Sequence, residues 1–187
     1  MKKLIALSLV PLLFGCLSAS TPRVSQWLLE YKGPVRATRI AKYEVGRVSQ
    51  VTIRSPYNEI GIAVLRADGS MAFDPYNEYA ANPTAMLKGF VFDAMDASGL
   101  FGSVLNSSSS VKSQAMSEIM VTRLALDCRK EGERKAVASV RVQLIANDGK
   151  ALHAQGEGTS DAKDGNYGAA LSDALSTALN TAFAQFR

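Results

Sequence analysis

The feature that most constrains the fold is an alternation of apolar and polar residues between positions 118 and 159. One side carries Met120, Thr122, Leu124, Leu126 and Cys128, then Val140, Val142 and Leu144, and then Leu152, Ala154, Gly156 and Gly158. The charged segment 130–134 and the dipeptide Asp148-Gly149 separate the three runs as turns. Because a period of two sends successive side chains to opposite faces, the pattern predicts a three-stranded antiparallel meander with one apolar and one polar face.

Two amphipathic segments predict helices. The first follows Asn82, which can cap free amides, and Pro83, which lacks the amide that would be unpaired at the first helical position. This helix is expected to end at Gly99. The second is expected from about Tyr167 to Phe186, and its apolar stripe consists of Leu171, Leu175, Ala178, Leu179, Ala182 and Phe186.

Further strands are expected at 26–31 and 45–56, and a hairpin over 59–76 turns at Asp68-Gly69. Neither the helices nor the sheet can bury an apolar surface alone, but helices packed on one sheet face satisfy both. The sequence therefore predicts an α+β, two-layer single domain over 25–187, with a mostly antiparallel sheet and two helices on one face.

The first residues have the pattern of an export signal. Lys2 and Lys3 precede an apolar stretch of about eleven residues, which is too short to span a bilayer but typical of a signal peptide. Gly15 followed by Cys16 resembles a bacterial lipobox, in which the bond between them is cut and the thiol is diacylated, with diacylglycerol and palmitate as the attached lipids. This predicts a signal peptide over 1–15 and an acylated cysteine with a polar tether over 16–24. Cleavage near Ser20 is the alternative, which would release an unanchored periplasmic protein.

Composition and motifs exclude several classes of function. Removing Lys2 and Lys3 from the 21 basic side chains leaves 19 against 17 acidic ones, so no nucleic acid partner is indicated. Cys128 would be the only cysteine of the mature chain besides the anchor, and a small apolar role is expected for it. With His153 as the single histidine, no multi-histidine metal site can form. We find no phosphate-binding loop and no nucleophile elbow, so we expect no enzyme activity, no catalytic residue, no cofactor and no metal.

Two groups of residues are candidate partner-binding surfaces. Phe73, Tyr76 and Tyr79 are expected in a loop between the hairpin and the first helix, either as a packed plug over the helix end or as a contact surface. The outer face of the last helix is almost uncharged, which is unusual for a solvated helix, and its candidate contact residues are Ser172, Ser176 and Asn180.

The order of elements resembles the ABC-type transport auxiliary lipoproteins. The similarity rests on the lipobox cysteine, "WLLEY" (27–31), the hairpin "IGIAVLRADGSMAFDPY" (60–76), "YNEYAANP" (76–83), "DASGLFGSVL" (96–105) and the alanine-rich last helix. Many members carry Trp where Tyr79 stands. The resemblance implies a lipid-anchored protein of the outer membrane that faces the periplasm. It would be an auxiliary, non-catalytic subunit for transport of lipids or hydrophobic compounds between the two membranes.

The implied partners are an inner-membrane ABC transporter with its mammalian-cell-entry-type substrate-binding protein, and a lipid ligand is a further expectation. A different class of function is also compatible with the sequence. A lipoprotein that regulates a cell-wall synthase or an outer-membrane assembly factor could have a similar small α+β domain.

Overall fold

A computed structural model describes residues 23–33 and 41–187. The predicted signal peptide, its cleavage site at Gly15 and Cys16, and the acylated cysteine all lie outside the described residues. The elements in chain order are β1 (Ser25–Trp27), β2 (Tyr43–Ile53), β3 (Gly61–Leu65), β4 (Met71–Tyr79), α1 (Pro83–Ala97), β5 (Phe101–Leu105), β6 (Ala115–Asp127), β7 (Lys135–Ala146), β8 (Ala151–Asp161), a 3-10 turn (Lys163–Gly165) and α2 (Tyr167–Ala184).

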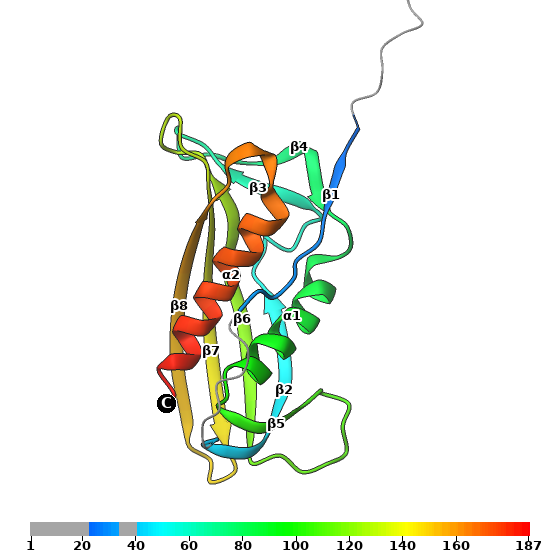
Figure 1. Ribbon diagram of the computed structural model, residues 1–187, viewed down its shortest axis with the longest axis vertical. Helices are drawn as coiled ribbons and strands as arrows, with labels where there is room; N and C mark the ends of the chain where they lie inside the picture. Colours follow the sequence, from blue (N-terminus) through cyan, green and yellow to red (C-terminus); the bar gives the residue numbers. More distant parts are fainter. Residues whose placement is uncertain (1–22, 34–40) are drawn as a thin grey trace, which may run out of the picture.

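The described strands form one eight-stranded sheet, and both helices lie on the same face of it (Figure 1). Strand β6 is central. Its first half pairs with β2 and its last residues pair with β3, while β7 lies along its other side. The prediction of one domain with two helices on one sheet face is therefore confirmed.

The sheet is mixed, so the prediction of a mostly antiparallel sheet is wrong. Among the described strands, β1–β4, β2–β5, β2–β6 and β3–β6 are parallel pairs. The pairs β3–β4, β6–β7 and β7–β8 are antiparallel. Antiparallel strands that follow each other along the chain can be recognised in the sequence by the tight turns between them. Parallel partners are joined by long crossover connections, which leave no local signal in the sequence. The domain is accordingly of the α/β type.

Local capping sets the ends of α1 as predicted. The side-chain oxygen of Asn82 accepts hydrogen bonds from the backbone N–H groups of Thr84 and Ala85, at 3.0 and 3.3 Å. Pro83 occupies the first turn, and Gly99 follows the helix with a φ of 67°, a left-handed conformation that glycine adopts without strain.

The main core lies between α2 and the meander β6–β7–β8. The predicted stripe of α2 is buried throughout. Two strand glycines allow the close approach, since a Cβ on Gly156 would lie 1.8 Å from the carbonyl oxygen of Ala178. A Cβ on Gly158 would lie 2.0 Å from the carbonyl oxygen of Ala174. Only residues without a side chain permit this helix–strand distance.

Three predicted boundaries or phases differ from the structure. Strand β1 ends at Trp27, and the strand β4 continues to Tyr79, so the three predicted loop aromatics lie in a strand. The register of β6 against β7 shifts between Val121 and Arg123. Because of this irregularity, Ile119 and Val121 face the core while Met120, predicted on the apolar side, is 44% exposed.

Candidate functional site

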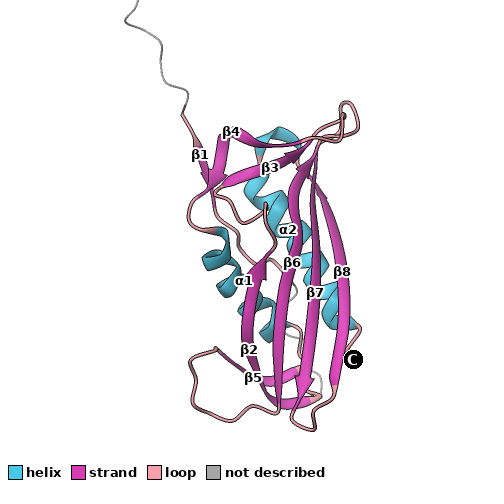
Figure 2. Cartoon of the chain, turned by 180° about the vertical axis from the view of Figure 1, so that it is seen from behind, coloured by secondary structure: helices cyan, strands magenta, loops and turns pink. Residues whose placement is uncertain are grey.

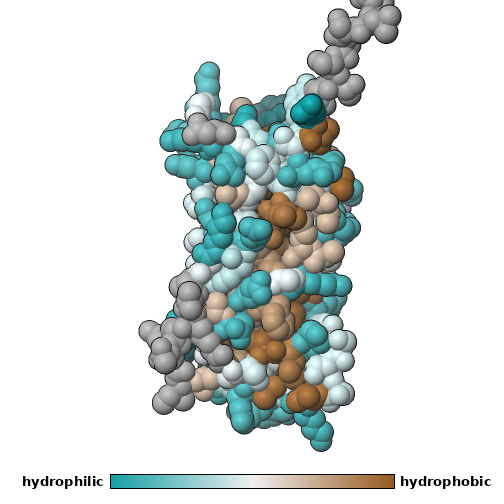
Figure 3. Space-filling model, turned by 45° about the vertical axis from the view of Figure 1, so that its right-hand side comes forward, coloured by the Kyte–Doolittle hydropathy of each residue, from teal (hydrophilic) through white to brown (hydrophobic). Residues whose placement is uncertain are grey.

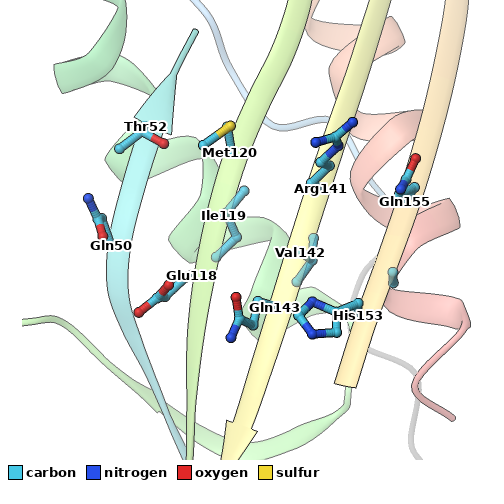
Figure 4. Close-up of a pocket in the computed structure, with 11 residues that line it drawn as sticks. Gln50, Thr52, Glu118, Ile119, Met120, Arg141, Val142, Gln143, His153 and Gln155 are labelled. Atoms are coloured by element: carbon cyan, nitrogen blue, oxygen red, sulfur yellow. The ribbon is translucent and has the colours of Figure 1, made fainter. Parts of the chain in front are cut away.

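The face of the sheet opposite the helices is the open face, and it is uncovered along β2, β6, β7 and β8 in the described structure (Figure 2). A hollow of about 530 Å³ lies on it (Figure 4). Its lining combines neutral polar, apolar and charged side chains: Gln50, Thr52, Glu118, Ile119, Met120, Arg141, Val142, Gln143, His153, Ala154 and Gln155.

Strand register arranges these side chains in cross-strand rows. Arg141 of β7 lies opposite Met120 of β6 and opposite Gln155 of β8. In the next row, Gln143 lies opposite Glu118 on one side and His153 on the other. Figure 4 shows the guanidinium of Arg141 directed away from the row of Gln143. Gln50 and Thr52 of β2 lie opposite Glu118 and Met120, so the rows bring together side chains from the three consecutive strands of the meander and from β2, which is distant in the sequence.

A second hollow of about 270 Å³ adjoins the first and contains three arginines, Arg54, Arg123 and Arg141. A guanidinium nitrogen of Arg123 lies 3.6 Å from a carboxylate oxygen of Glu157, and the Arg123 Nε is buried without a hydrogen-bond partner. The side chains of Arg54 and Arg141 form no ion pair or hydrogen bond with a described residue. An ion pair this long with an exposed carboxylate contributes little to stability, so these guanidiniums are available to a ligand or partner.

The guanidinium and amide side chains of the open face are of the kinds that bind a ligand or a partner protein by hydrogen bonds. In the described residues no three His, Cys, Asp or Glu side chains gather to hold a metal ion. His153 is exposed on the outer strand β8, and Cys128 is half-buried beside the core with its thiol free. The absence of enzyme activity and of a cofactor stays a prediction.

The predicted aromatic group is divided between surface and core. Phe73 and Tyr76 are 40% and 53% exposed, whereas Tyr79 is 1% exposed and packs in the main core. Burial raises the pKa of the Tyr79 phenol. Packing therefore accounts for Tyr79, and the surface interpretation applies to the other two rings.

The predicted polar face of α2 is covered by the chain itself. We call residues 28–33 the strap. The backbone N–H groups of Glu30 and Lys32 donate to the hydroxyl oxygens of Ser172 and Ser176, at 3.1 and 3.3 Å. The Tyr31 hydroxyl donates to the side-chain oxygen of Asn180 at 2.9 Å.

The strap also packs against the other helix. The rings of Tyr31 and of Phe90 of α1 form a T-shaped pair with 5.6 Å between centroids, and burial raises the pKa of the Tyr31 phenol. Leu29 is buried in the main core. This packing explains why the helix face lacks charge, and contact of Ser172, Ser176 and Asn180 with another protein stays a prediction.

The sequence pattern did not predict the open-face residues as a site. The alternation had placed Arg141, Gln143 and His153 on the polar face of the meander, which was the available signal. The contribution of Gln50 and Arg54 could not be seen, because the parallel pairing of β2 with β6 joins segments about 70 residues apart.

Comparisons with known proteins give similarity of fold. No protein-family model matches the sequence, and no curated protein is significantly similar to it. Two crystal structures share the fold with a TM-score of 0.61 at 15% identity. One is an uncharacterized protein, matched over 88% of this chain and 94% of its own. The other is protein XCC0632 from Xanthomonas campestris, of the family DUF330, matched over 87% and 92%.

More distant similarities include a dodecameric protein and a lipoprotein. A PelC dodecamer from Paraburkholderia phytofirmans matches 79% of this chain and 89% of its own at 17% identity, with a TM-score of 0.40. Lipoprotein GNA1162 from Neisseria meningitidis matches 67% and 88% at 13% identity, with a TM-score of 0.29. No helix of the described residues is both long and apolar enough to cross a bilayer.

Proposed function

We propose that this chain is a periplasm-facing lipoprotein of the outer membrane that acts by docking, as the auxiliary subunit of an intermembrane ABC transport system for lipids or hydrophobic compounds. The partner would be the inner-membrane transporter with its mammalian-cell-entry-type substrate-binding protein. One observation carries the proposal. The domain leaves a four-stranded face open, and this face carries guanidinium and amide groups without partners among the described residues.

The open face has the chemistry of a polar contact surface. Arg141 and Arg123 present planar, permanently charged groups that bind carboxylates with two parallel hydrogen bonds. Gln143 and Gln155 each supply both a donor and an acceptor. A lipid anchor at Cys16 would hold this face near its partner, and the raised effective concentration would make a weak contact sufficient.

A charge reversal on this face tests the proposal. Arg141→Glu leaves the packed side of β7 unchanged and would place a carboxylate where the partner is expected to present acidic groups. We expect recovery of the transporter subunits with the affinity-purified full-length protein to fall strongly. Lys88→Glu, an exposed reversal on α1 of the helical layer, is the matched control and should leave recovery unchanged.

The same purification distinguishes this proposal from the alternative class of function, a lipoprotein that regulates a cell-wall synthase or an outer-membrane assembly factor. Recovery of a cell-wall synthase or an outer-membrane assembly factor, with no transporter subunit, would overturn the proposal. Equal recovery with Arg141→Glu and the wild-type chain would show that the partner binds elsewhere on the domain.

A further inference from the structure

Exposed apolar side chains gather at one end of the molecule. Outside the main core, the described residues include nine large apolar side chains that are exposed. Five of them belong to the adjacent strands β1, β3 and β4 or to the residues that flank these strands. We call these five the end patch: Val24, Leu28, Ile60, Phe73 and Tyr76.

Strand register places members of the end patch beside each other. In the parallel pair β1–β4, Ser25 lies opposite Asn77, so Val24 lies beside Tyr76. On the other side of β4, the Cβ of Phe73 would be 3.0 Å from a Cβ on Gly61, the residue next to Ile60. Phe73 thus lies directly over Gly61, the residue that follows Ile60.

A local turn holds Tyr76 outward. Strand β4 departs from regular pairing with β3 between Phe73 and Glu78. Within this irregular segment, the carboxylate of Asp74 accepts hydrogen bonds from the Tyr76 N–H at 2.9 Å and from the Asn77 side chain at 3.0 Å. The exposure of the ring is therefore fixed by backbone geometry.

The chain toward the predicted anchor leaves from this same end. Figures 1 and 2 show the described chain beginning at the β1 end, and Figure 3 shows apolar atoms beside the point of departure. Six residues separate Cys16 from Arg23. At full extension the seven Cα–Cα steps from Cys16 to Arg23 reach about 25 Å. The 13-residue strand β6 alone is about 40 Å long, which is more than the reach of this connection. The β1 end is therefore the end of the domain nearest to the anchor.

We propose that the end patch is a membrane-contact surface, with Phe73 and Tyr76 inserted at the headgroup level of the bilayer that holds the anchor. The inference rests on the proposed acylation of Cys16. An aromatic ring with a polar tip is favoured at this depth, because its apolar body leaves water while its hydroxyl stays hydrated. The patch supplements the acyl chains and fixes the orientation of the domain.

The charges at this end indicate apolar insertion in preference to attraction by anionic lipid. Arg23 and Arg66 are accompanied by the acidic residues Glu59, Asp68 and Asp74. In the β6–β7 turn, which lies at the same end beside β3, Arg129 pairs with Asp127 and Lys130 with Glu133, so the end is not basic. The contact should consequently form on zwitterionic vesicles and change little with salt, in contrast to a polybasic segment.

The test is depth-dependent quenching of a fluorophore. The full-length acylated protein, in a Cys128→Ala background, is reconstituted in phosphatidylcholine vesicles that contain a spin-labelled lipid. A polarity-sensitive fluorophore is attached to Phe73→Cys or Tyr76→Cys. Leu152→Cys and Val111→Cys are matched controls near the opposite end, with exposures of 40% and 54% against 40% and 53%.

We expect severalfold stronger quenching and a blue-shifted emission at positions 73 and 76 relative to 152 and 111. Equal quenching at the two ends, or quenching at 73 and 76 that appears only with a second protein, would overturn the proposal. The mass of the mature N-terminus and the recovery of transporter subunits are measured on the same protein. Failure of the end patch is therefore distinguishable from failure of the anchor or of docking.

Discussion

Tyr79 of the core and Tyr31, which packs against the core, have opposite hydrogen-bonding environments. The hydroxyl of Tyr31 donates to Asn180, whereas the buried hydroxyl of Tyr79 has no partner among the described residues. A buried polar group without a partner loses its hydration without compensation. We expect Tyr79→Phe to raise the free energy of unfolding by about 1 kcal/mol, and Tyr31→Phe to lower it by about 1 kcal/mol. Urea denaturation followed by circular dichroism measures both, and a loss of stability in Tyr79→Phe would contradict this assignment.

Tyr79 also makes the free energy of unfolding depend on pH in the alkaline range. Because burial raises the pKa of Tyr79 above that of the unfolded chain, its neutral form favours folding. This contribution is complete below the unfolded pKa of about 10 and is lost as the pH rises toward the folded value. Tyr79→Phe should accordingly lose less stability than the wild-type protein between neutral pH and pH values above about 10. Parallel slopes of stability against pH for the two proteins would disprove this role.

At the scale of elements, the approach of α2 to β8 depends on two glycines. A methyl group on Gly156 would overlap the backbone of α2, which cannot move as a flexible side chain can. We expect Gly156→Ala to lower the free energy of unfolding by about 1–3 kcal/mol. Gly89→Ala is the control, because no atom lies within 4 Å of its Cβ position, and alanine should stabilise α1 by about 0.5–1 kcal/mol. Thermal unfolding of the two variants should shift in opposite directions.

The elements also show what could be predicted from sequence. Both helices, the meander and the turns at Gly69 and Gly149 follow from local patterns, because caps, glycines and side-chain periods act within a few residues. The predicted alternation of β6 places Leu124 and Leu126 correctly but is out of phase before Arg123. One extra residue between Val121 and Arg123 reverses the alternation there. The parallel partners of β2 depend on tertiary packing, so the open face that they complete was not predicted as a site.

At the scale of the whole molecule, the end patch and the open face would have separate tasks. If the β1 end lies against the outer membrane, the long strands β6, β7 and β8 point away from it. The open face is then lateral to the membrane, accessible to a partner that extends across the periplasm. Insertion at one end and docking along one side would not compete for the same residues.

The strap directly follows β1, and Trp27, the single tryptophan and the last residue of β1, reports on it. Its indole N–H donates to Asn77 at 2.8 Å, and its ring lies 6.1 Å from that of Tyr167 of α2. Because the strap contributes Leu29 to the main core, we expect it to unfold together with the domain. Tryptophan fluorescence and far-ultraviolet circular dichroism should give the same midpoint in guanidinium.

Removing the two hydroxyls that hold the strap should uncouple it from the domain. In the double variant Ser172→Ala and Ser176→Ala, two strap N–H groups lose their acceptors, at about 1 kcal/mol each. The fluorescence midpoint should then fall below that of circular dichroism. Thr181→Ala is the control, since its exposed hydroxyl donates within α2 to Thr177. Coincident midpoints in the double variant would mean that the apolar contacts of Leu29 and Tyr31 hold the strap on the domain without these two hydrogen bonds.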